Sequence, residues 1–513
     1  MKYKEHYDVV IVGSGLAGLV SAIILAKEGK SVCVLEKNNQ YGGNLQTFVR
    51  NKTIFDTGVH YIGGLTEGQN LHQYFKYIDI LKGLTFHKMD EDGFDIISFD
   101  SDPKEYRHAQ GYDNFIKNLL EDFPEEEKGI RMYCNKLQET CKKFPLYSLK
   151  KGKPYYDDAE IFQLPAKEFI NSFTKNKKLQ AVLAGSNYLY AGDKNRTPFF
   201  VHALSTNSYI QSSYRCLNGG SQITKVLIKR LKEHGGDCYK RHEVSKFNFD
   251  DGKIGSVTTT NGLEIKGNLF ISNIEPKLTI KMVGEDKFRK SYTNRIDKIE
   301  STIAAFTLYL VLKPNSFKYQ NKNFYHFKDA DKVWDSHDYT QESWPEGYMM
   351  SMGIKKNSNG YGDSIAVMTY MRYDEVEPWA DSFNTVANKN ERGQTYEQFK
   401  TEKAEVLIDE LEKKFPNIRD CIEAYYTSSP LSYRDYIGSN RGSMYAYVKD
   451  VNNPLHSHVS PKTKIKNLFF TGQSLNMHGI LGVTISAIIT CSEILGKDYL
   501  LDKILESNKH EVL

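Results

Sequence analysis

Residues 7–36 read YDVVIVGSGLAGLVSAIILAKEGKSVCVLE, and this stretch decides the fold. Residues 7–12 are rich in β-branched side chains and predict a buried strand, Leu16–Lys27 predict a helix, and Ser31–Leu35 predict a second strand. A strand, a helix and a further strand in so short a span make a βαβ unit with parallel strands. The stretch therefore predicts an α/β fold.

Three glycines lie between the first strand and the helix, at Gly13, Gly15 and Gly18. The first permits a tight turn, the second lets the backbone approach a pyrophosphate, and the third lets helix and strand pack closely. Leu16 and Ala17 open the helix, whose N-terminal amides and positive potential favour an anion. We therefore expect a dinucleotide at this turn.

An acidic residue, Glu36, ends the second strand eighteen residues after Gly18. At that position a carboxylate accepts hydrogen bonds from the ribose hydroxyls of an adenosine and repels a 2′-phosphate. Lys37 follows directly and belongs to the same predicted site. The expected ligand is a dinucleotide without a 2′-phosphate.

A second glycine motif, YGGNLQT at 41–47, resembles the second glycine signature of glutathione-reductase-type and amine-oxidase-type flavoproteins. This resemblance implies FAD rather than NAD as the cofactor and places Gly42, Gly43 and Asn44 at its pyrophosphate. Many members of those families carry Arg where this chain has Asn44. Backbone amides or groups elsewhere in the chain must then compensate the charge of the pyrophosphate.

A third motif, TGQSLNMHGILGVTISA at 471–487, resembles the closing motif of the same flavoproteins, in which a turn meets the ribityl chain and a helix N-terminus faces the flavin pyrimidine. The resemblance assigns the cofactor to Gly472, Gln473, Gly482, Val483 and Thr484. A helix N-terminus there would stabilise an anionic reduced flavin.

Two further expectations concern how FAD is held. Val244 lies where these families supply backbone hydrogen bonds to the adenine. No cysteine occurs between Thr471 and Gly482, where some amine oxidases attach their flavin covalently. We therefore expect noncovalent FAD.

The other strands and helices of the predicted nucleotide-binding domain are scattered along the chain. We expect a helix at Gly219–His234, strands at Glu243–Phe249, Lys253–Thr259, Glu264–Ser272 and Asn467–Thr471, and a helix at Val483–Leu495. The predicted architecture is a Rossmann-type FAD-binding domain interleaved with an α+β substrate domain. The predicted FAD-binding domain consists of residues 1–70, 215–280 and 461–513. The predicted substrate domain consists of residues 71–214 and 281–460. The first of these two substrate segments holds irregular strands and helices, and the second contains a further helix at Tyr396–Phe415.

Composition excludes several functions. Lys and Arg total 68 against 64 for Asp and Glu, so a formal charge of +4 is spread thinly and does not favour nucleic acid. The seven cysteines are scattered and form neither a CxxC pair nor a zinc cluster, which favours a reducing compartment. No secretion signal is evident, and the uncharged stretches Val9–Ala26 and Asn467–Ser492 read as core rather than membrane spans. We expect a cytoplasmic protein with peripheral membrane contact.

Two longer stretches narrow the family. FVRNKTIFDTGVHYIGGL at 48–65 and SSPLSYRDYIGSNRGSMYAY at 428–447 resemble the phytoene desaturase, carotenoid isomerase and retinol saturase superfamily, and most closely its retinol saturase branch. The resemblance implies a long hydrophobic cavity that presents a polyene to flavin N5 for hydride transfer. We find no second GxGxxG motif for a nicotinamide domain, so an unidentified electron donor or acceptor is also implied.

The resemblance brings three titratable residues near the flavin as candidate proton donors, namely His60, Tyr61 and His478. Four functions stay open on the sequence: a saturase or desaturase of a carotenoid or retinoid, a flavin-dependent cis-trans isomerase, a non-enzymatic isoprenoid carrier resembling Rab GDP dissociation inhibitors, and an amine oxidase. The intact glycine motifs argue against the carrier, and HYIGG and YRDYIG fit the amine oxidase less well.

Overall fold

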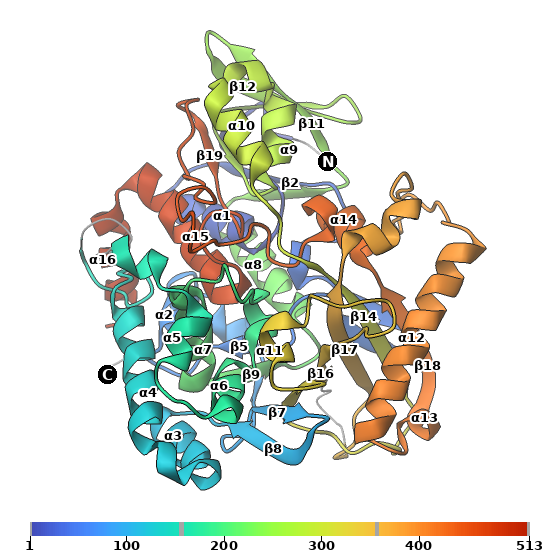
Figure 1. The fold of residues 1–513 in the computed structure, drawn as a ribbon. Helices are drawn as coiled ribbons and strands as arrows, with labels where there is room; N and C mark the ends of the chain where they lie inside the picture. Colours follow the sequence, from blue (N-terminus) through green and yellow to red (C-terminus); the bar gives the residue numbers. More distant parts are fainter. Residues whose placement is uncertain (1–2, 153–158, 354–358, 510–513) are drawn as a thin grey trace.

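The computed structural model describes residues 3–152, 159–353 and 359–509. Within these residues the chain builds two seven-stranded sheets and two smaller ones, and Figure 1 shows helices around both large sheets. No helix of the described ranges is long and apolar enough to cross a membrane.

The nucleotide-type sheet has the strand order β10-β2-β1-β13-β12-β11, with β19 also paired to β13. Its strands are β1 (His6–Val12), β2 (Val32–Glu36), β10 (Asp237–Lys240), β11 (Val244–Asp250), β12 (Lys253–Thr259), β13 (Glu264–Ser272) and β19 (Leu468–Phe470). The pairs β10/β2, β2/β1, β1/β13 and β13/β19 are parallel, whereas β11, β12 and β13 form an antiparallel meander. The predicted βαβ unit and the predicted meander are both confirmed.

Three helices cover one face of this sheet: α1 (Leu16–Lys27), α8 (Ser221–Glu233) and α15 (Gly479–Leu495). Leu16 to Ala26 of α1 are all buried, because the helix lies between α8, α15 and the sheet. A helix that is apolar all round is a core helix in a globular protein. The opposite face packs Tyr7, Val10 and Phe270 against α9 (Pro276–Val283).

Helix α15 begins at Gly479, so the predicted start at Val483 was wrong. His478 is extended, and Gly479 follows it with a φ of 73°. The glycines in HGILG suggested a turn, yet Gly482 lies inside the helix, where a Cβ would come within 2.7 Å of the Met477 Cβ. The path of the chain as it enters the helix therefore requires a glycine at a helical position.

The second large sheet has the order β18-β14-β17-β16-β15-β7-β8 and is antiparallel except for the pair β15/β7. Its strands are β7 (Asp95–Phe99), β8 (Asp102–His108), β14 (Ala304–Leu312), β15 (Asn323–Phe327), β16 (Gly347–Met352), β17 (Ser364–Met371) and β18 (Ile422–Ser428). The amphipathic helix α12 (Gln394–Lys414) packs Leu407, Ile408 and Leu411 into the core of this sheet. The helix predicted at Tyr396–Phe415 is therefore confirmed.

A helical layer encloses the other side of the second sheet and joins a core with Tyr325, Phe327 and Tyr370. Figure 1 shows this layer at the lower left, beside α15. The remaining elements are α2 (Asn70–Tyr77), α3 (Tyr112–Asp122), α4 (Glu127–Lys142), α5 (Ala166–Asn171), α6 (Lys177–Ala184), α7 (Phe199–Gln211), α10 (Lys290–Lys298), α11 (Lys332–Asp335), α13 (Ile418–Cys421), α14 (Pro430–Ile437), α16 (Lys497–Ser507), β3 (Thr47–Arg50), β4 (Thr53–Asp56), β5 (Ile62–Gly63), β6 (Phe86–Lys88) and β9 (Ser213–Cys216). The chain passes repeatedly between the two large sheets, so the α/β fold with an interleaved α+β region is confirmed, while the domain boundaries stay a prediction.

The contact between α1 and the glycine turn can be tested at Gly18. A Cβ at this position would lie 2.3 Å from the Gly13 carbonyl oxygen, a backbone atom that cannot rotate away. We expect Gly18→Ala to lower the free energy of unfolding by about 1–3 kcal/mol through overpacking, measured by chemical denaturation. Gly93→Ala is the control, because its Cβ would make only ordinary contacts with the Arg107 side chain, at 3.4–3.5 Å. Equal stability of Gly18→Ala and the unmodified protein would contradict the expectation.

Candidate cofactor and substrate site

A cavity of about 340 Å³, here called the central cavity, opens where β1, β2 and β13 end. One end of it is lined by Gly13, Gly15, Glu36 and other residues of the glycine motifs. The other end is lined by aromatic and sulfur-containing side chains: Tyr61, Tyr188, Tyr209, Tyr325, Met349, Met368, Tyr433, Met444 and Tyr445. Ligands of parallel α/β sheets bind at the carboxyl ends of the strands, which is where this cavity lies.

Two glycine turns meet at the N-terminus of α1. Gly15 pairs with Gly42 in an isolated bridge, and a Cβ on Gly43 would lie 3.3 Å from the Gly15 Cα. Gly13 and Gly42 have φ angles of 95° and 114°, which only glycine adopts readily. No side chain caps α1 at Gly15, so its first amides are available to an anion. This is a pyrophosphate-binding geometry.

The helix residues of the first motif divide into two groups. Leu16 lines the central cavity together with Gly13 and Gly15. Ala17 is fully buried in the core between helix and sheet, and Gly18 packs against the Gly13 carbonyl. Ala17 and Gly18 therefore stabilise the glycine turn by packing and do not face the cavity.

Glu36 is only 5% exposed and lines the central cavity. Its Oε2 accepts a hydrogen bond from the Ser14 amide at 3.1 Å and its Oε1 accepts one from the Asn38 amide at 2.9 Å. The Ser14 hydroxyl also donates to Oε2, so the lone pair left for a ribose hydroxyl is on Oε1. Lys37 also lines the cavity and donates to the Asp435 carbonyl at 3.0 Å, and burial lowers the pKa of its ammonium.

Most of the remaining predicted cofactor residues line the central cavity, but two do not. Asn44, Val244, Gly472, Gln473 and Val483 all line the central cavity. Ser486 clamps the turn there, because its hydroxyl accepts from the Gly472 amide at 3.0 Å and donates to the Gly472 carbonyl at 2.9 Å.

Gly482 and Thr484 do not line the central cavity. Gly482 lines a neighbouring cavity, and the Thr484 hydroxyl donates to the Ile480 carbonyl at 2.7 Å within the helix. The early start of α15 turns both residues away from the cofactor side.

Asn273 is a site residue that the sequence reasoning missed. It follows β13 directly, its amide Nδ2 donates to the Gly13 carbonyl at 3.2 Å, and it lines the central cavity. A Cβ on Gly15 or Gly472 would collide with this side chain. The available signal was its place one residue after a parallel strand, where polar side chains gather at ligand sites.

Of the three predicted proton donors, the two histidines are neutral at pH 7. Burial lowers the pKa of His60 to about 4, and the nearby Arg215 adds to the effect. Burial also lowers the pKa of His478 to about 4, and its Nε2 donates to the Leu189 carbonyl at 2.7 Å. All three residues line the central cavity, but neither imidazole carries a second proton at neutral pH.

Tyr61 instead belongs to a buried hydrogen-bond network. Its hydroxyl donates to Asp95 Oδ2 at 2.8 Å and lies 2.7 Å from the Tyr325 hydroxyl. Asn323 donates to the other oxygen of Asp95 at 2.8 Å. Burial raises the pKa of the Asp95 carboxyl to about 7, although the hydrogen bonds from Asn323 and Tyr61 and the charge of Arg215 oppose this shift. The network couples a titrating carboxyl to two phenols in the cavity wall.

A second cavity of about 630 Å³, here called the apolar cavity, adjoins the central cavity. Both are lined by Leu189, Tyr209, His478, Gly479 and Ile480, so they meet at the start of α15. Its walls include Phe144, Leu146, Phe162, Phe200, Leu204, Met477, Leu481, Ile485 and Ile489. A drug-sized apolar molecule fits such a volume and such walls.

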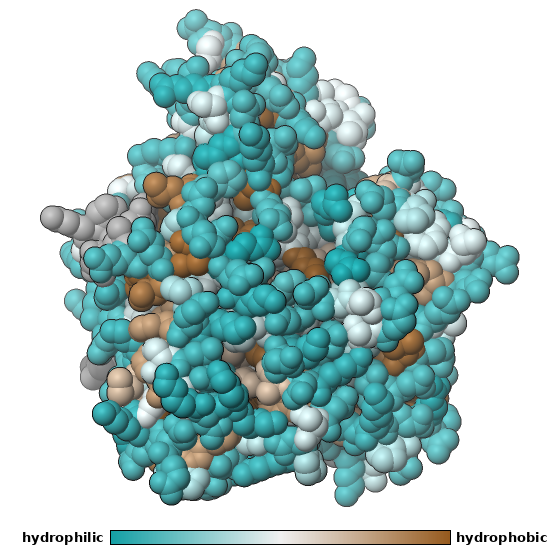
Figure 2. All heavy atoms as spheres, viewed as in Figure 1, coloured by the Kyte–Doolittle hydropathy of each residue, from teal (hydrophilic) through white to brown (hydrophobic). Residues whose placement is uncertain are grey.

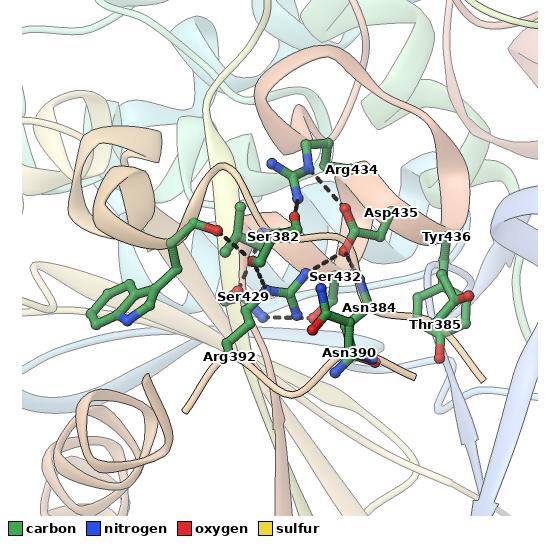
Figure 3. Close-up of polar contacts among 12 residues, drawn as sticks. Ser382, Asn384, Thr385, Asn390, Arg392, Ser429, Ser432, Arg434, Asp435 and Tyr436 are labelled. Carbon is green, nitrogen blue, oxygen red and sulfur yellow. Dashed lines mark hydrogen bonds and ion pairs between the residues drawn. The ribbon is translucent and has the colours of Figure 1, made fainter. Parts of the chain in front are cut away.

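The C-terminal end of α14 forms the rim of the central cavity through Tyr436, Ile437 and Gly438. Figure 3 shows the buried polar cluster that holds it in place. Asp435 is fully buried and accepts from Arg434 at 2.7 Å, from the Asn384 amide at 2.8 Å and from Arg392. Arg434 is thus a salt-bridging residue that holds the rim, whereas Tyr433 and Tyr436 line the cavity.

This cluster is testable at its centre. Asp435→Ala leaves Arg392 without its carboxylate in a buried site, and removing one partner of a buried ion pair costs about 3–5 kcal/mol. We expect that loss in the free energy of unfolding, measured by chemical denaturation. Asp381→Ala, at an exposed position of the same region, should change stability little. Equal effects of the two substitutions would contradict this assignment.

The comparisons with known proteins agree with this geometry. A family model described as an NAD(P)-binding Rossmann-like domain matches residues 11–78. All-trans-retinol 13,14-reductase from Rattus norvegicus is 27% identical over 98% of this chain and 88% of its own length. Prolycopene isomerase 1, chloroplastic, from an Oncidium hybrid cultivar is 24% identical over 97% of this chain and 85% of its own length. Cyclohexylamine oxidase from Brevibacterium oxydans has the same fold, with a TM-score of 0.59 at 13% identity over 95% of this chain and 99% of its own.

The fold and the central cavity define a Rossmann-type dinucleotide-binding protein whose nucleotide sheet is interleaved with a second, α+β region. Within that class the chain fits the superfamily of phytoene desaturases, carotenoid isomerases and retinol saturases, and in it the retinol saturase branch. The resemblance inferred from the sequence motifs is thereby confirmed.

Proposed function

We propose that the protein is an FAD-dependent oxidoreductase that acts on carbon-carbon double bonds of an apolar isoprenoid polyene, such as a retinoid or carotenoid. One observation carries this proposal: a pyrophosphate-binding cradle and an aromatic chamber share the central cavity, which opens onto a large apolar cavity. The full-length similarity to a retinol reductase and to a carotenoid isomerase supports the substrate class.

The cavity residues fit FAD as the dinucleotide. Glu36 would hold the adenosine ribose, the α1 amides and the Gly42–Gly43 turn would hold the pyrophosphate, and Gly472 and Gln473 would meet the ribityl chain. The flavin ring would then reach the chamber that contains Tyr61, Tyr325 and His478. All cysteines of the described residues are free thiols, and none of them lines the central cavity, which supports noncovalent binding.

When bound, FAD supplies two-electron hydride chemistry at its N5. The proton for the second carbon of a reduced double bond would come from Tyr325, Tyr61 and Asp95. With Asp95 ionised, Tyr61 donates to it and Tyr325 donates to Tyr61. With Asp95 protonated, the order reverses, and the Tyr325 O–H is released toward the cavity that this side chain lines. Asp95 thus serves as the proton reserve, and Tyr325 as the terminal donor.

A second candidate function is cis-trans isomerisation of the same substrates, which the similarity to prolycopene isomerase favours. An isomerase needs the same cofactor cradle and the same apolar cavity. It returns a product of unchanged mass, whereas saturation adds two hydrogens and desaturation removes two.

Net oxidation or reduction requires an electron donor or acceptor from outside the chain.

The apolar substrate must also reach the apolar cavity. Leu455, which is 77% exposed, lies in the wall of that cavity. Figure 2 shows hydrophobic residues on the side of the molecule near α15 within a mostly hydrophilic face. These features support peripheral contact with a membrane as part of the proposal.

The proposed function can be tested directly on the purified protein. We expect the visible absorbance bands of a flavin, released by denaturation because the link is noncovalent. Anaerobic mixing with a panel of retinoids and carotenoids, followed by mass spectrometry, should give a product changed by two hydrogens. A product of unchanged mass would support the isomerase instead. A colourless protein that takes up no FAD would contradict both and favour a carrier.

The proton reserve predicts a specific pH profile. Because Asp95 loses its proton near pH 7, the rate of double-bond reduction should fall as pH rises through about 7, and the rate of desaturation should rise. Asp95→Asn cannot ionise and should remove this inflection, and Tyr325→Phe should lower kcat at least about a hundredfold without loss of flavin. Steady-state rates across pH and flavin absorbance provide the measurements.

Asp56→Asn is the matched control for Asp95→Asn. Burial also raises the pKa of Asp56 to about 7, but its carboxylate accepts from the Gly220 amide and it does not line the central cavity. Asp56→Asn should keep the inflection. An inflection that survives Asp95→Asn and disappears in Asp56→Asn would refute the assignment.

A further inference from the structure

A lysine lies in the wall of the apolar cavity, at the place where this cavity meets another. Lys449 lines the apolar cavity and also a neighbouring cavity of about 600 Å³, and Met477 and His478 line both of these as well. His478 lines the central cavity too. Lys449 therefore lies between the apolar cavity and this neighbouring cavity, close enough to His478 to contribute to the lowering of its pKa.

The charge of Lys449 has no counterion among the described residues. Its Nζ donates to the Leu475 carbonyl at 3.3 Å, which uses one of its three hydrogens. Burial lowers its pKa to about 8, and no neighbouring carboxylate opposes that shift. The adjacent Asp450 is engaged locally, since its Oδ1 accepts from the backbone amide of Asn452 at 2.9 Å. At neutral pH most of the lysine carries an uncompensated charge.

The charge of Lys449 affects the pKa values of two nearby histidines. Burial is the main cause of the low pKa of His478 and of His458, and the charge of Lys449 contributes to both shifts. Both imidazoles line the apolar cavity and are neutral. Two carboxylates, Asp450 and Glu493, also line the apolar cavity, but Asp450 accepts from the Asn452 amide and Glu493 pairs with Lys462. An anion beside Lys449 would therefore meet one unpaired cation and two neutral rings.

We infer that Lys449 binds the carboxylate of a polyene that ends in a carboxylic acid, with the apolar chain in the apolar cavity. A terminal hydroxyl would leave the charge of the half-buried Lys449 uncompensated, because a neutral oxygen brings no counter-charge. A diphosphate carries more negative charge than a single lysine neutralises. One carboxylate matches one ammonium and forms a charge-assisted hydrogen bond.

The same geometry directs the chain of such a ligand toward the flavin side. From Lys449 the apolar cavity continues along Met477 and His478 to Leu189 and Tyr209, which it shares with the central cavity. A carboxylate held at Lys449 would thus orient one end of the polyene and leave its double bonds free to enter the aromatic chamber. This inference rests on the proposed function and narrows its substrate class.

Equilibrium dialysis of the holoprotein against all-trans-retinoic acid and its methyl ester tests the inference, with bound ligand quantified by chromatography. The two probes share the polyene and differ in charge. We expect the acid to bind at least about tenfold more tightly than the ester, as a charge-assisted hydrogen bond allows. Lys449→Met should bring the ratio of the two dissociation constants to about one, and Lys449→Arg should keep the preference for the acid.

Lys466→Met, at an exposed lysine, is the matched control and should keep the full preference. Unchanged flavin absorbance in Lys449→Met shows that this variant is folded. Equal binding of acid and ester by the unmodified protein, or a preference that survives Lys449→Met, would overturn the role of Lys449 while leaving the proposed function intact. Failure of both probes to bind the unmodified protein would overturn the retinoid-like substrate class as well.

Discussion

The close approach of two backbone turns at the N-terminus of α1 is the constraint on which the rest of this structure depends. Gly15 and Gly42 pair directly, and a side chain on Gly13, Gly15 or Gly43 would strike a neighbouring backbone or side-chain atom. Because the space in front of these turns stays clear, the helix amides face it without a side-chain cap. Glu36 takes two of the nearby amides, which fixes its carboxylate at the edge of the same space.

That edge is completed by segments far apart in the chain. β13 and β19 bring Asn273 and the Gly472 turn beside Gly13, and α14 brings its C-terminal rim against Lys37 and Asn38. The rim depends on a fully buried carboxylate shared by two arginines (Figure 3). Buried ion pairs of this kind contribute little net stability, because the cost of removing both charges from water offsets their attraction.

Burial, more than residue type, decides which groups in the site can exchange protons near neutral pH. Desolvation keeps His60 and His478 neutral, whereas it raises the pKa of Asp95 into the neutral range. The same cause lowers the pKa of Lys449 to about 8, and no neighbouring carboxylate opposes that shift. A site built for an apolar substrate therefore places its few polar groups where low dielectric shifts their chemistry.

The local sequence by itself determined the βαβ unit, the meander and the glycine motifs, because strand and helix periods and the steric needs of glycine act over a few residues. Its motifs also identified Tyr61 and His478 as candidate residues of the site. Only the tertiary structure decided that α15 begins at Gly479, that Asn273 joins the glycine turn, and that Asp95 and Tyr325 stand behind Tyr61. Those facts depend on burial and on contacts between residues far apart in the chain, such as the hydrogen bond from Asn273 to the Gly13 carbonyl, and a pattern of a few residues does not contain these contacts.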